Sequence, residues 1–270
     1  MENSSPFAAS RDAFLDIVDA KTYVQLDRVA IVYKSMMEAL KKPLKLILLY
    51  GAPGTGKSMM LGRIHSELRA AQKIVLYQTP ITDESEFFRC LARDVYGEET
   101  DAPVNFTRFN ELAERSAFET TPIVLLDEAQ MYGSALMEKI RLIADARKIK
   151  FVITLHKTEQ EDVIAKEHFQ TRIWESQRLY NANADELKVY IQKKLLRANC
   201  FDVARMFNDK NVHRIHALTG GNYRDTNKLL FTLFSIAVWY EENQPTQISF
   251  SAVSRKLIEM AAIETGFIHA

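Results

Sequence analysis

One segment of the sequence has the residue types and spacing of a phosphate-binding loop. Residues 46–50 are an apolar run that leads into Gly51-Ala52-Pro53-Gly54-Thr55-Gly56-Lys57-Ser58, in which every fixed position of the G-x-x-x-x-G-K-[ST] pattern is filled. The glycines let successive backbone N–H groups converge on an anion, and the helix expected after them adds the positive end of its dipole. We therefore expect these eight residues to bind a nucleoside triphosphate, with Lys57 on the β- and γ-phosphates and Ser58 on Mg²⁺.

A pair of acidic residues follows another apolar run. Residues 123–126 are typical of a buried strand, and Asp127 and Glu128 come directly after them. Because ligands bind at the carboxyl ends of the strands in open α/β sheets, we expect Asp127 to hold Mg²⁺, directly or through water. Glu128 would polarise the attacking water as a general base. Two acids at a strand end can also be merely solvated, and it is the phosphate-binding loop that favours the catalytic interpretation.

The elements that would position these residues alternate in type. Short, almost continuously apolar runs are typical of strands buried on both faces of a parallel sheet. Stretches with helical periodicity separate them and are long enough for the crossovers that parallel strands require. The expected strands are residues 46–50, 74–78, 123–126 and 151–155, with a fifth, shorter one at 178–180, and the expected helices are 26–41, 57–71, 84–96, 107–118 and 135–146.

The pattern changes in the last third of the chain. Only helix-like segments follow there, at 185–198, 209–218, 224–240 and 251–263. A boundary therefore falls near residues 181–183. We predict an α/β nucleotide-binding domain over residues 1–182, built on a parallel five-stranded sheet, and a small all-helical lid domain over residues 183–270.

The composition excludes several classes of protein. Lys and Arg total 35, as do Asp and Glu, so the formal net charge is zero, which argues against a strongly basic nucleic-acid coat protein. Two cysteines cannot form a disulfide framework or a four-ligand zinc site, which favours a reducing, cytoplasmic setting. The N-terminus lacks the basic and apolar parts of a secretory signal. No apolar run reaches the roughly 18 residues of a membrane span, so we expect no direct membrane insertion.

The phosphate-binding loop, the acidic pair and the α/β-then-helical order together resemble the AAA+ P-loop ATPases. Two segments are similar to the secretion and pilus ATPases of the ExeA, GspA and MshM kind, to which the TniB and TnsC transposition ATPases are related. These are Asp127-Glu128-Ala129-Gln130 and a G-G-x-x-R-x-x-N segment at residues 220–227. The similarity spans roughly residues 20 to 265. It implies an AAA+ base followed by a helical lid, with ATP and Mg²⁺ as cofactors.

The resemblance also implies three further catalytic residues. The polar sensor that positions the nucleophilic water is Thr154 or His156, which lie on the same side of the fourth strand. We favour His156, although ExeA-like proteins commonly carry Gln there, and a strand-capping histidine is the alternative. Arg224 matches the lid arginine that reaches the γ-phosphate, the alternative being a surface arginine on the first turn of a helix. Arg172 matches the arginine presented to a neighbouring subunit's ATP, and Arg178 is the other candidate.

These similarities imply an ATPase, forming ADP and phosphate, that needs oligomerisation or a partner for full activity. A head-to-tail contact of this kind generates a ring or a helical assembly. By resemblance, ATP hydrolysis would drive assembly or remodelling of a secretion, pilus or DNA-uptake apparatus through a membrane-bound protein partner. The chain would then be cytoplasmic and peripheral at the inner membrane, and we expect no room for the span and wall-binding region of larger ExeA-like proteins.

Two other functions fit the same residues. One is an ATP-dependent DNA-binding target selector for transposition, and the other is a nucleotide-gated scaffold that barely hydrolyses ATP. DNA binding remains open, but zero net charge favours a protein partner, because a DNA-coating ATPase should carry a positive surplus.

Overall fold

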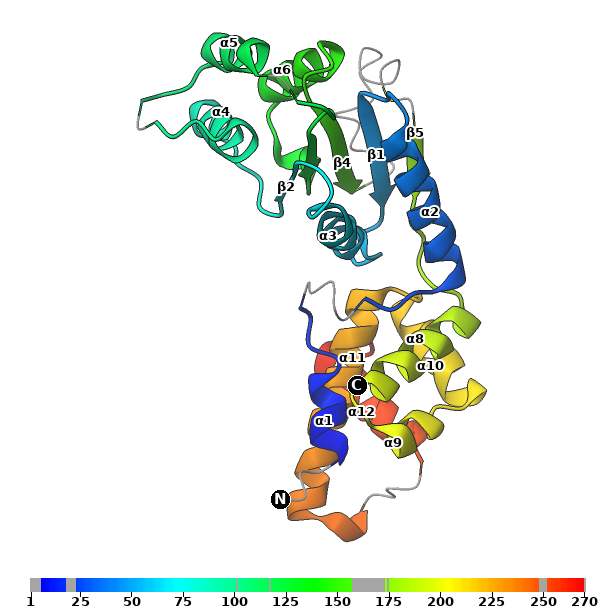
Figure 1. Cartoon of the computed structure of the whole chain (residues 1–270). Helices are drawn as coiled ribbons and strands as arrows, with labels where there is room; N and C mark the ends of the chain where they lie inside the picture. The colour runs from blue at the N-terminus through cyan, green and yellow to red at the C-terminus, as the bar shows by residue number, and fades with distance from the viewer. Residues whose placement is uncertain are drawn as a thin grey trace. The chain divides into compact units, whose positions relative to one another are not determined.

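Five strands form one parallel sheet in the computed structural model, in the order β2-β3-β4-β1-β5 (Figure 1). Each strand pairs in parallel with its neighbours, so all five carboxyl ends lie at the same edge. The parallel five-stranded sheet predicted from the sequence is thereby confirmed. The strands are β1 (Leu46–Gly51), β2 (Ile74–Tyr77), β3 (Ile123–Leu126), β4 (Lys150–His156) and β5 (Glu175–Arg178).

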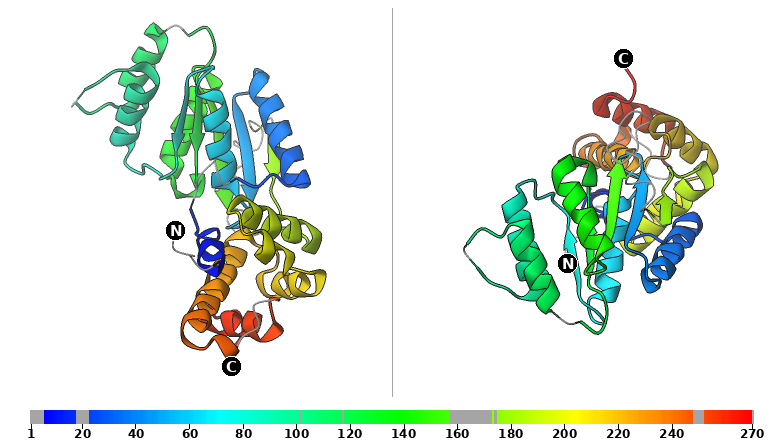
Figure 2. Two further views of the ribbon diagram at one scale, coloured as in Figure 1. Left: turned by 60° about the horizontal axis from the view of Figure 1, so that its bottom comes forward. Right: turned by 90° about the horizontal axis from the view of Figure 1, so that it is seen from above.

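Helices cover both faces of the sheet, which explains why its inner strands are apolar throughout (Figure 2). In β1, Ile47 and Leu49 pack with the helices on one face, whereas Leu46 and Leu48 pack with those on the other. The first face is covered by α2 (Asp27–Lys41) and α3 (Lys57–Leu68), and the second by α4 (Glu84–Leu91), α5 (Phe106–Arg115) and α6 (Ser134–Asp145).

Several predicted elements begin or end at other residues in the structure; the last helix, expected at 251–263, lies at Arg255–Thr265, and two further differences have a clear physical reason. The helix expected over residues 84–96 is α-helical only to Leu91 and continues as a π-helical turn, η2 (Ala92–Tyr96), which ends at Gly97 with a φ of 74°. The fifth strand was expected at residues 178–180 and lies at 175–178, so the two share only Arg178. β5 is a polar strand that pairs with β1 alone, and a strand of this kind has no apolar run to mark its position.

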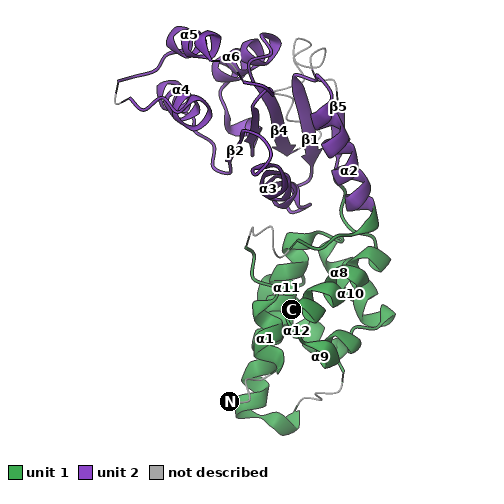
Figure 3. Ribbon diagram, in the orientation of Figure 1, with its two compact units in different colours: residues 1–27, 180–270 green, residues 28–179 purple. Residues whose placement is uncertain are grey.

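The chain divides into two compact units (Figure 3). Arg28–Leu179 form the unit that holds the sheet, and Met1–Asp27 join Tyr180–Ala270 in the other. The domain boundary after residue 182 stays a prediction. The structure describes residues 6–17, 23–100, 102–116, 118–156, 173, 175–247 and 252–269. Within those ranges, no helix combines the length and the apolar character needed to cross a membrane.

The second unit is helical, as predicted for the C-terminal part of the chain. Its core gathers around Phe234 of α11 (Tyr223–Asn243). The Phe234 ring lies 6.3 Å from that of Phe7, 5.8 Å from that of Phe14 and 6.1 Å from that of Phe207. Two of these rings come from the N-terminal residues, which accounts for their place in this unit. The helices are α1 (Pro6–Asp12), α8 (Ala184–Arg197), α9 (Phe201–Arg205), α10 (Asp209–Thr219), α11 (Tyr223–Asn243) and α12 (Arg255–Thr265).

Candidate active site

The phosphate-binding loop joins the carboxyl end of β1 to the start of α3. Two of its glycines have left-handed backbones, with φ of 77° at Gly54 and 92° at Gly56. Between them, Thr55 is buried and its hydroxyl donates to the carbonyl of Ala52 at 2.8 Å. Lys57 is only 4% exposed, and its Nζ donates to the carbonyls of Gly51 and Ala52 at 2.8 and 2.9 Å. The sequence thus folds into a loop that holds an ammonium group against its own backbone.

The glycine that begins the loop is required by a close backbone approach. A Cβ on Gly51 would lie 2.5 Å from the carbonyl oxygen of Leu179, which follows β5 and whose N–H donates to Tyr50 at 2.8 Å. Gly56 has open space beside it, because a Cβ there would meet no atom within 4 Å. The loop is therefore packed on one side and open on the other. An open, left-handed backbone at a helix N-terminus fits a phosphate group.

The acidic pair lies at the carboxyl end of β3, where Asp127 is 3% exposed and Thr154 of the neighbouring strand β4 is fully buried. The Thr154 hydroxyl donates to Oδ1 of Asp127 in a short hydrogen bond. Glu128 has a left-handed backbone, with φ of 51°, and its N–H donates to Asp127 Oδ1 and Thr154 Oγ1, both at 3.0 Å. This backbone costs about 1–2 kcal/mol in a residue with a side chain. The two acceptors hold the Glu128 backbone in place, and the Glu128 carboxylate takes no part in these two bonds.

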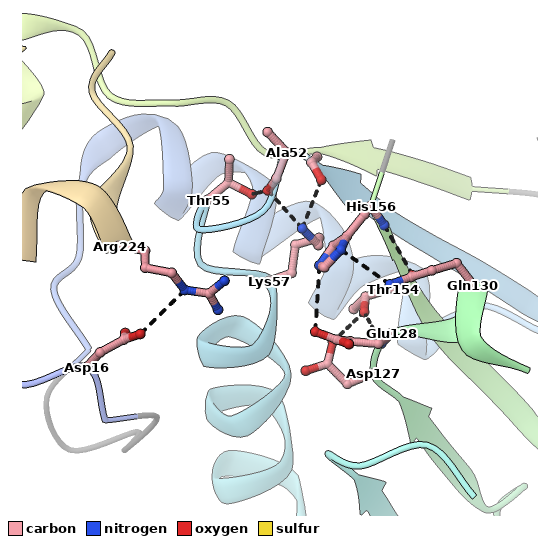
Figure 4. Close-up of polar contacts among 11 residues, drawn as sticks. Asp16, Ala52, Thr55, Lys57, Asp127, Glu128, Gln130, Thr154, His156 and Arg224 are labelled. Atoms are coloured by element: carbon pink, nitrogen blue, oxygen red, sulfur yellow. Dashed lines mark hydrogen bonds and ion pairs between the residues drawn. The ribbon is translucent and has the colours of Figure 1, made fainter. Parts of the chain in front are cut away.

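The Glu128 carboxylate faces His156. His156 Nε2 lies 3.8 Å from Glu128 Oε1, and the two side chains are 25% and 40% exposed (Figure 4). On its other side, the His156 ring lies against the side-chain amide of Gln130, with Gln130 Nε2 3.3 Å from His156 Nδ1. Sequence reasoning assigned no role to Gln130, although it completes the Asp127-Glu128-Ala129-Gln130 segment.

The order of the strands brings these groups to one edge of the sheet. β4 lies between β1 and β3, and in its register His156 is opposite Gly51 while Ile153 is opposite Leu126. The loop, the acidic pair and both sensor candidates therefore share the carboxyl edge of three adjacent strands. Oxygen ligands such as the Ser58 hydroxyl and the Asp127 carboxylate suit Mg²⁺, which takes its other ligands from phosphates and water. The residues present thus fit a nucleotide with Mg²⁺.

The predicted arginines are placed differently. Arg224 lies in the first turn of α11 in the helical unit, 57% exposed, with its Nε 3.4 Å from Oδ2 of Asp16. Arg178 lies at the end of β5, and its guanidinium lies 6.0 Å from the centre of the Tyr50 ring. Arg172 falls outside the described residues. The roles proposed for these three residues stay predictions.

Hydrogen bonds of two asparagines stabilise the start of the helix that carries Arg224. Asn222 caps α11 by accepting from the N–H groups of Arg224 and Asp225 at 3.1 and 3.3 Å. Asn227, one turn further, is buried and accepts from the Tyr190 hydroxyl of α8 at 2.8 Å. The two asparagines fix the start of the helix that carries Arg224, a role for Asn227 that the sequence pattern alone did not reveal.

Two adjacent glycines before α11 allow a test of how tightly the backbone is packed at the start of this helix. Gly220 and Gly221 both have positive φ, but only Gly221 is closely approached: a Cβ there would lie 1.9 Å from the Ala182 carbonyl oxygen. We expect Gly220→Ala to lower the free energy of unfolding by about 1–2 kcal/mol through its left-handed backbone. Gly221→Ala should cost at least about 2 kcal/mol more, because the backbone must also move. Urea denaturation measures both, and equal losses would contradict the predicted clash.

The parallel sheet, with the G-x-x-x-x-G-K-[ST] loop between β1 and α3, defines a P-loop fold of the α/β class. More particularly, residues 41–163 match the family model of the AAA domain, and the fold is of the AAA+ type. No curated protein sequence matches the chain.

Solved structures show the same fold. The ORC1 protein of Aeropyrum pernix in complex with DNA is 18% identical, with a TM-score of 0.67 over 94% of this chain and 69% of that one. Domain III of the replication initiation protein DnaA from Thermotoga maritima is 18% identical, with a TM-score of 0.56 over 94% and 98%. The RuvB Holliday junction branch migration motor of Thermotoga maritima is 17% identical, with a TM-score of 0.60 over 93% and 73%.

Proposed function

We propose that this chain binds ATP with Mg²⁺ and hydrolyses it to ADP and phosphate as an AAA+ switch. The observation that carries the proposal is the convergence of three groups at one sheet edge: the loop with its buried Lys57, the Asp127–Thr154 pair, and the Glu128 carboxylate beside His156. Phosphoryl transfer relies on positioning and charge stabilisation, and these groups supply both.

Each residue has a distinct part in this proposal. Lys57 would exchange its loop carbonyls for the β- and γ-phosphates, and Ser58 and Asp127 would hold a Mg²⁺ ion, which would supply charge neutralisation at the phosphates. Glu128 accepts a proton from the attacking water. Thr154 fixes the Asp127 carboxylate, and His156 is the sensor beside Glu128. We keep the division into a base to residue 182 and a lid from 183, with Arg224 as the lid arginine.

We further propose that subunits complete one another's sites in a ring or helical assembly, with Arg172 as the arginine given to the neighbour. Hydrolysis per subunit should then rise with protein concentration. Arg172→Ala should reduce the rate to that of the dilute chain. Arg178, on the sheet edge beside Tyr50, is the other candidate, and the same loss in Arg178→Ala with none in Arg172→Ala would assign the role to Arg178 instead.

Mixing two inactive variants tests the shared site directly. Lys57→Ala subunits keep Arg172, and Arg172→Ala subunits keep an intact loop, so a mixture should regain activity that neither has alone. An inactive mixture, together with a wild-type rate independent of concentration, would refute the shared site.

We propose two alternative roles, which differ in the partner of the chain. The sequence resemblance supports a role in assembling a secretion, pilus or DNA-uptake apparatus through a protein at the inner membrane. The solved structures support the alternative, a DNA-dependent role, because ORC1 was solved with DNA and RuvB is a Holliday junction motor. Double-stranded DNA should stimulate hydrolysis in the second case, with affinity that falls steeply as salt rises. Lack of DNA affinity at low salt would remove it.

A further inference from the structure

The side chain of Gln130 contacts both the backbone and the ring of His156. His156 ends β4, and Gln130 lies in η3 (Ala129–Met131), the short turn after β3. Gln130 Oε1 accepts from the backbone N–H of His156 at 3.3 Å, while Gln130 Nε2 lies 3.3 Å from His156 Nδ1 (Figure 4).

These contacts determine which end of the amide meets the ring. A backbone N–H can only donate, so the atom that faces it must be the Gln130 oxygen. The Gln130 nitrogen then faces Nδ1, and because an NH₂ group can only donate, Nδ1 must offer its lone pair. A neutral imidazole with a lone pair on Nδ1 carries its proton on Nε2.

The other ring nitrogen faces the residue expected to activate water. His156 Nε2 lies 3.8 Å from Glu128 Oε1. The Glu128 backbone is fixed by its two hydrogen bonds to Asp127 and Thr154, so its side chain is the part left to be oriented. An N–H at Nε2 attracts the carboxylate, whereas a lone pair there would repel it.

We propose that Gln130 is a positioning residue that selects the Nε2–H tautomer of His156, so that the ring presents a donor to the Glu128 carboxylate. The proposal deepens the function above and rests on it for the role of Glu128 in hydrolysis. The selection of the tautomer follows from the geometry of Gln130 and His156 alone. The competing explanation is that Gln130 merely ties η3 to the end of β4.

The first test is a direct observation of the tautomer. Long-range ¹H–¹⁵N NMR spectra distinguish Nε2–H from Nδ1–H histidines, and His156→Gln assigns the signals of this ring. At about pH 8.5, where an ordinary imidazole is neutral, wild type should show Nε2–H. In Gln130→Glu the isosteric carboxylate can still accept from the His156 backbone but can only accept at Nδ1, so Nδ1 should gain a proton. A wild-type ring with Nδ1–H, or no change in the variant, would overturn the proposal.

The second test links the tautomer to catalysis through a double-mutant cycle. Gln130→Glu should lower kcat for ATP by about tenfold or more, the scale on which outer partners of site residues act, with KM changed less than about twofold. In a His156→Gln background the same change should have little further effect, because a glutamine has no tautomer to select. A purely structural tie would instead give the same loss in both backgrounds and refute the positioning role.

A matched substitution and an independent readout separate the possible failures. Gln72→Glu, at a partly buried glutamine in the same unit beyond the end of α3, makes the same charge change away from the site and should leave kcat unchanged. If wild type proves unable to hydrolyse ATP, the proposed function fails. The NMR result still decides the tautomer in that case, so the two failures remain distinguishable.

Discussion

Lys57→Ala is expected to abolish ATP binding. The Lys57 ammonium is buried in the loop and bonded to two loop carbonyls, so it is fixed beside the position that the phosphates would take. Removing it takes away a charge-assisted contact to the phosphates, and such contacts are about twice as strong as neutral hydrogen bonds. We expect the Kd for ATP to rise by at least about 100-fold, which corresponds to about 2.7 kcal/mol. Isothermal titration calorimetry of the full chain measures this change.

A second buried lysine provides the control for this experiment. Lys150, at the amino end of β4, also donates its ammonium group to two backbone carbonyls, those of Leu40 and Lys42. Burial lowers its pKa, and its removal should destabilise the fold, but it lies at the opposite end of β4 from His156. Lys150→Ala should therefore lower the free energy of unfolding while leaving ATP affinity within about twofold of wild type. Equal affinity losses in both variants would mean that Lys57 acts only through stability.

The parts of the site that the sequence predicts are those encoded in contiguous segments. Residues 51–58 carry their own turn geometry, because Gly54 and Gly56 supply the positive φ angles and the strand and helix around them set the direction. The four apolar strands were placed to within one or two residues, since strands covered on both faces must be apolar throughout. The fifth strand was predicted at the wrong residues because Glu175 to Arg178 is polar and this strand is defined only by its pairing with β1.

What the sequence does not reveal depends on contacts between distant segments. Gln130 and His156 lie 26 residues apart, and they meet only because β3 and β4 pair with Leu126 opposite Ile153. A register shifted by one residue would turn His156 to the other face of the sheet. α1 was missed for a similar reason: its seven residues are too few for a periodic signal, and Phe7 packs against Phe234 of α11 far along the chain.

The left-handed backbone at Glu128 is a third feature that no sequence pattern predicted. Non-glycine residues rarely adopt a positive φ, and in this chain the conformation is held by the carboxylate of Asp127 and the hydroxyl of Thr154. Such strained positions cluster at functional sites, where the surrounding structure enforces them. The Glu128 carboxylate lies beside His156 and the Asp127 carboxylate accepts from Thr154, so the two adjacent acids have different surroundings.

Glu128→Gln should separate binding from turnover. Glutamine has the size and shape of glutamate, and the backbone contacts to Asp127 and Thr154 do not involve the substituted group, so ATP affinity should stay within about twofold of wild type. The amide cannot accept the proton of the attacking water, and loss of a general base typically costs 10²–10⁴-fold in rate. We expect kcat to fall by about 10³-fold, measured by phosphate release.

The control is Glu111→Gln, an exposed change in α5 that removes a surface pair with Arg108. It should alter neither the ATP affinity nor kcat. Full turnover in Glu128→Gln would refute the assignment of the base.

The slow Glu128→Gln variant also addresses the question of the partner. If it holds ATP without hydrolysing it, it should remain in the ATP-bound state that binds the partner. Its capture from the native cells should then yield either proteins of a membrane apparatus or DNA with a transposase, and each result excludes one of the two proposed roles.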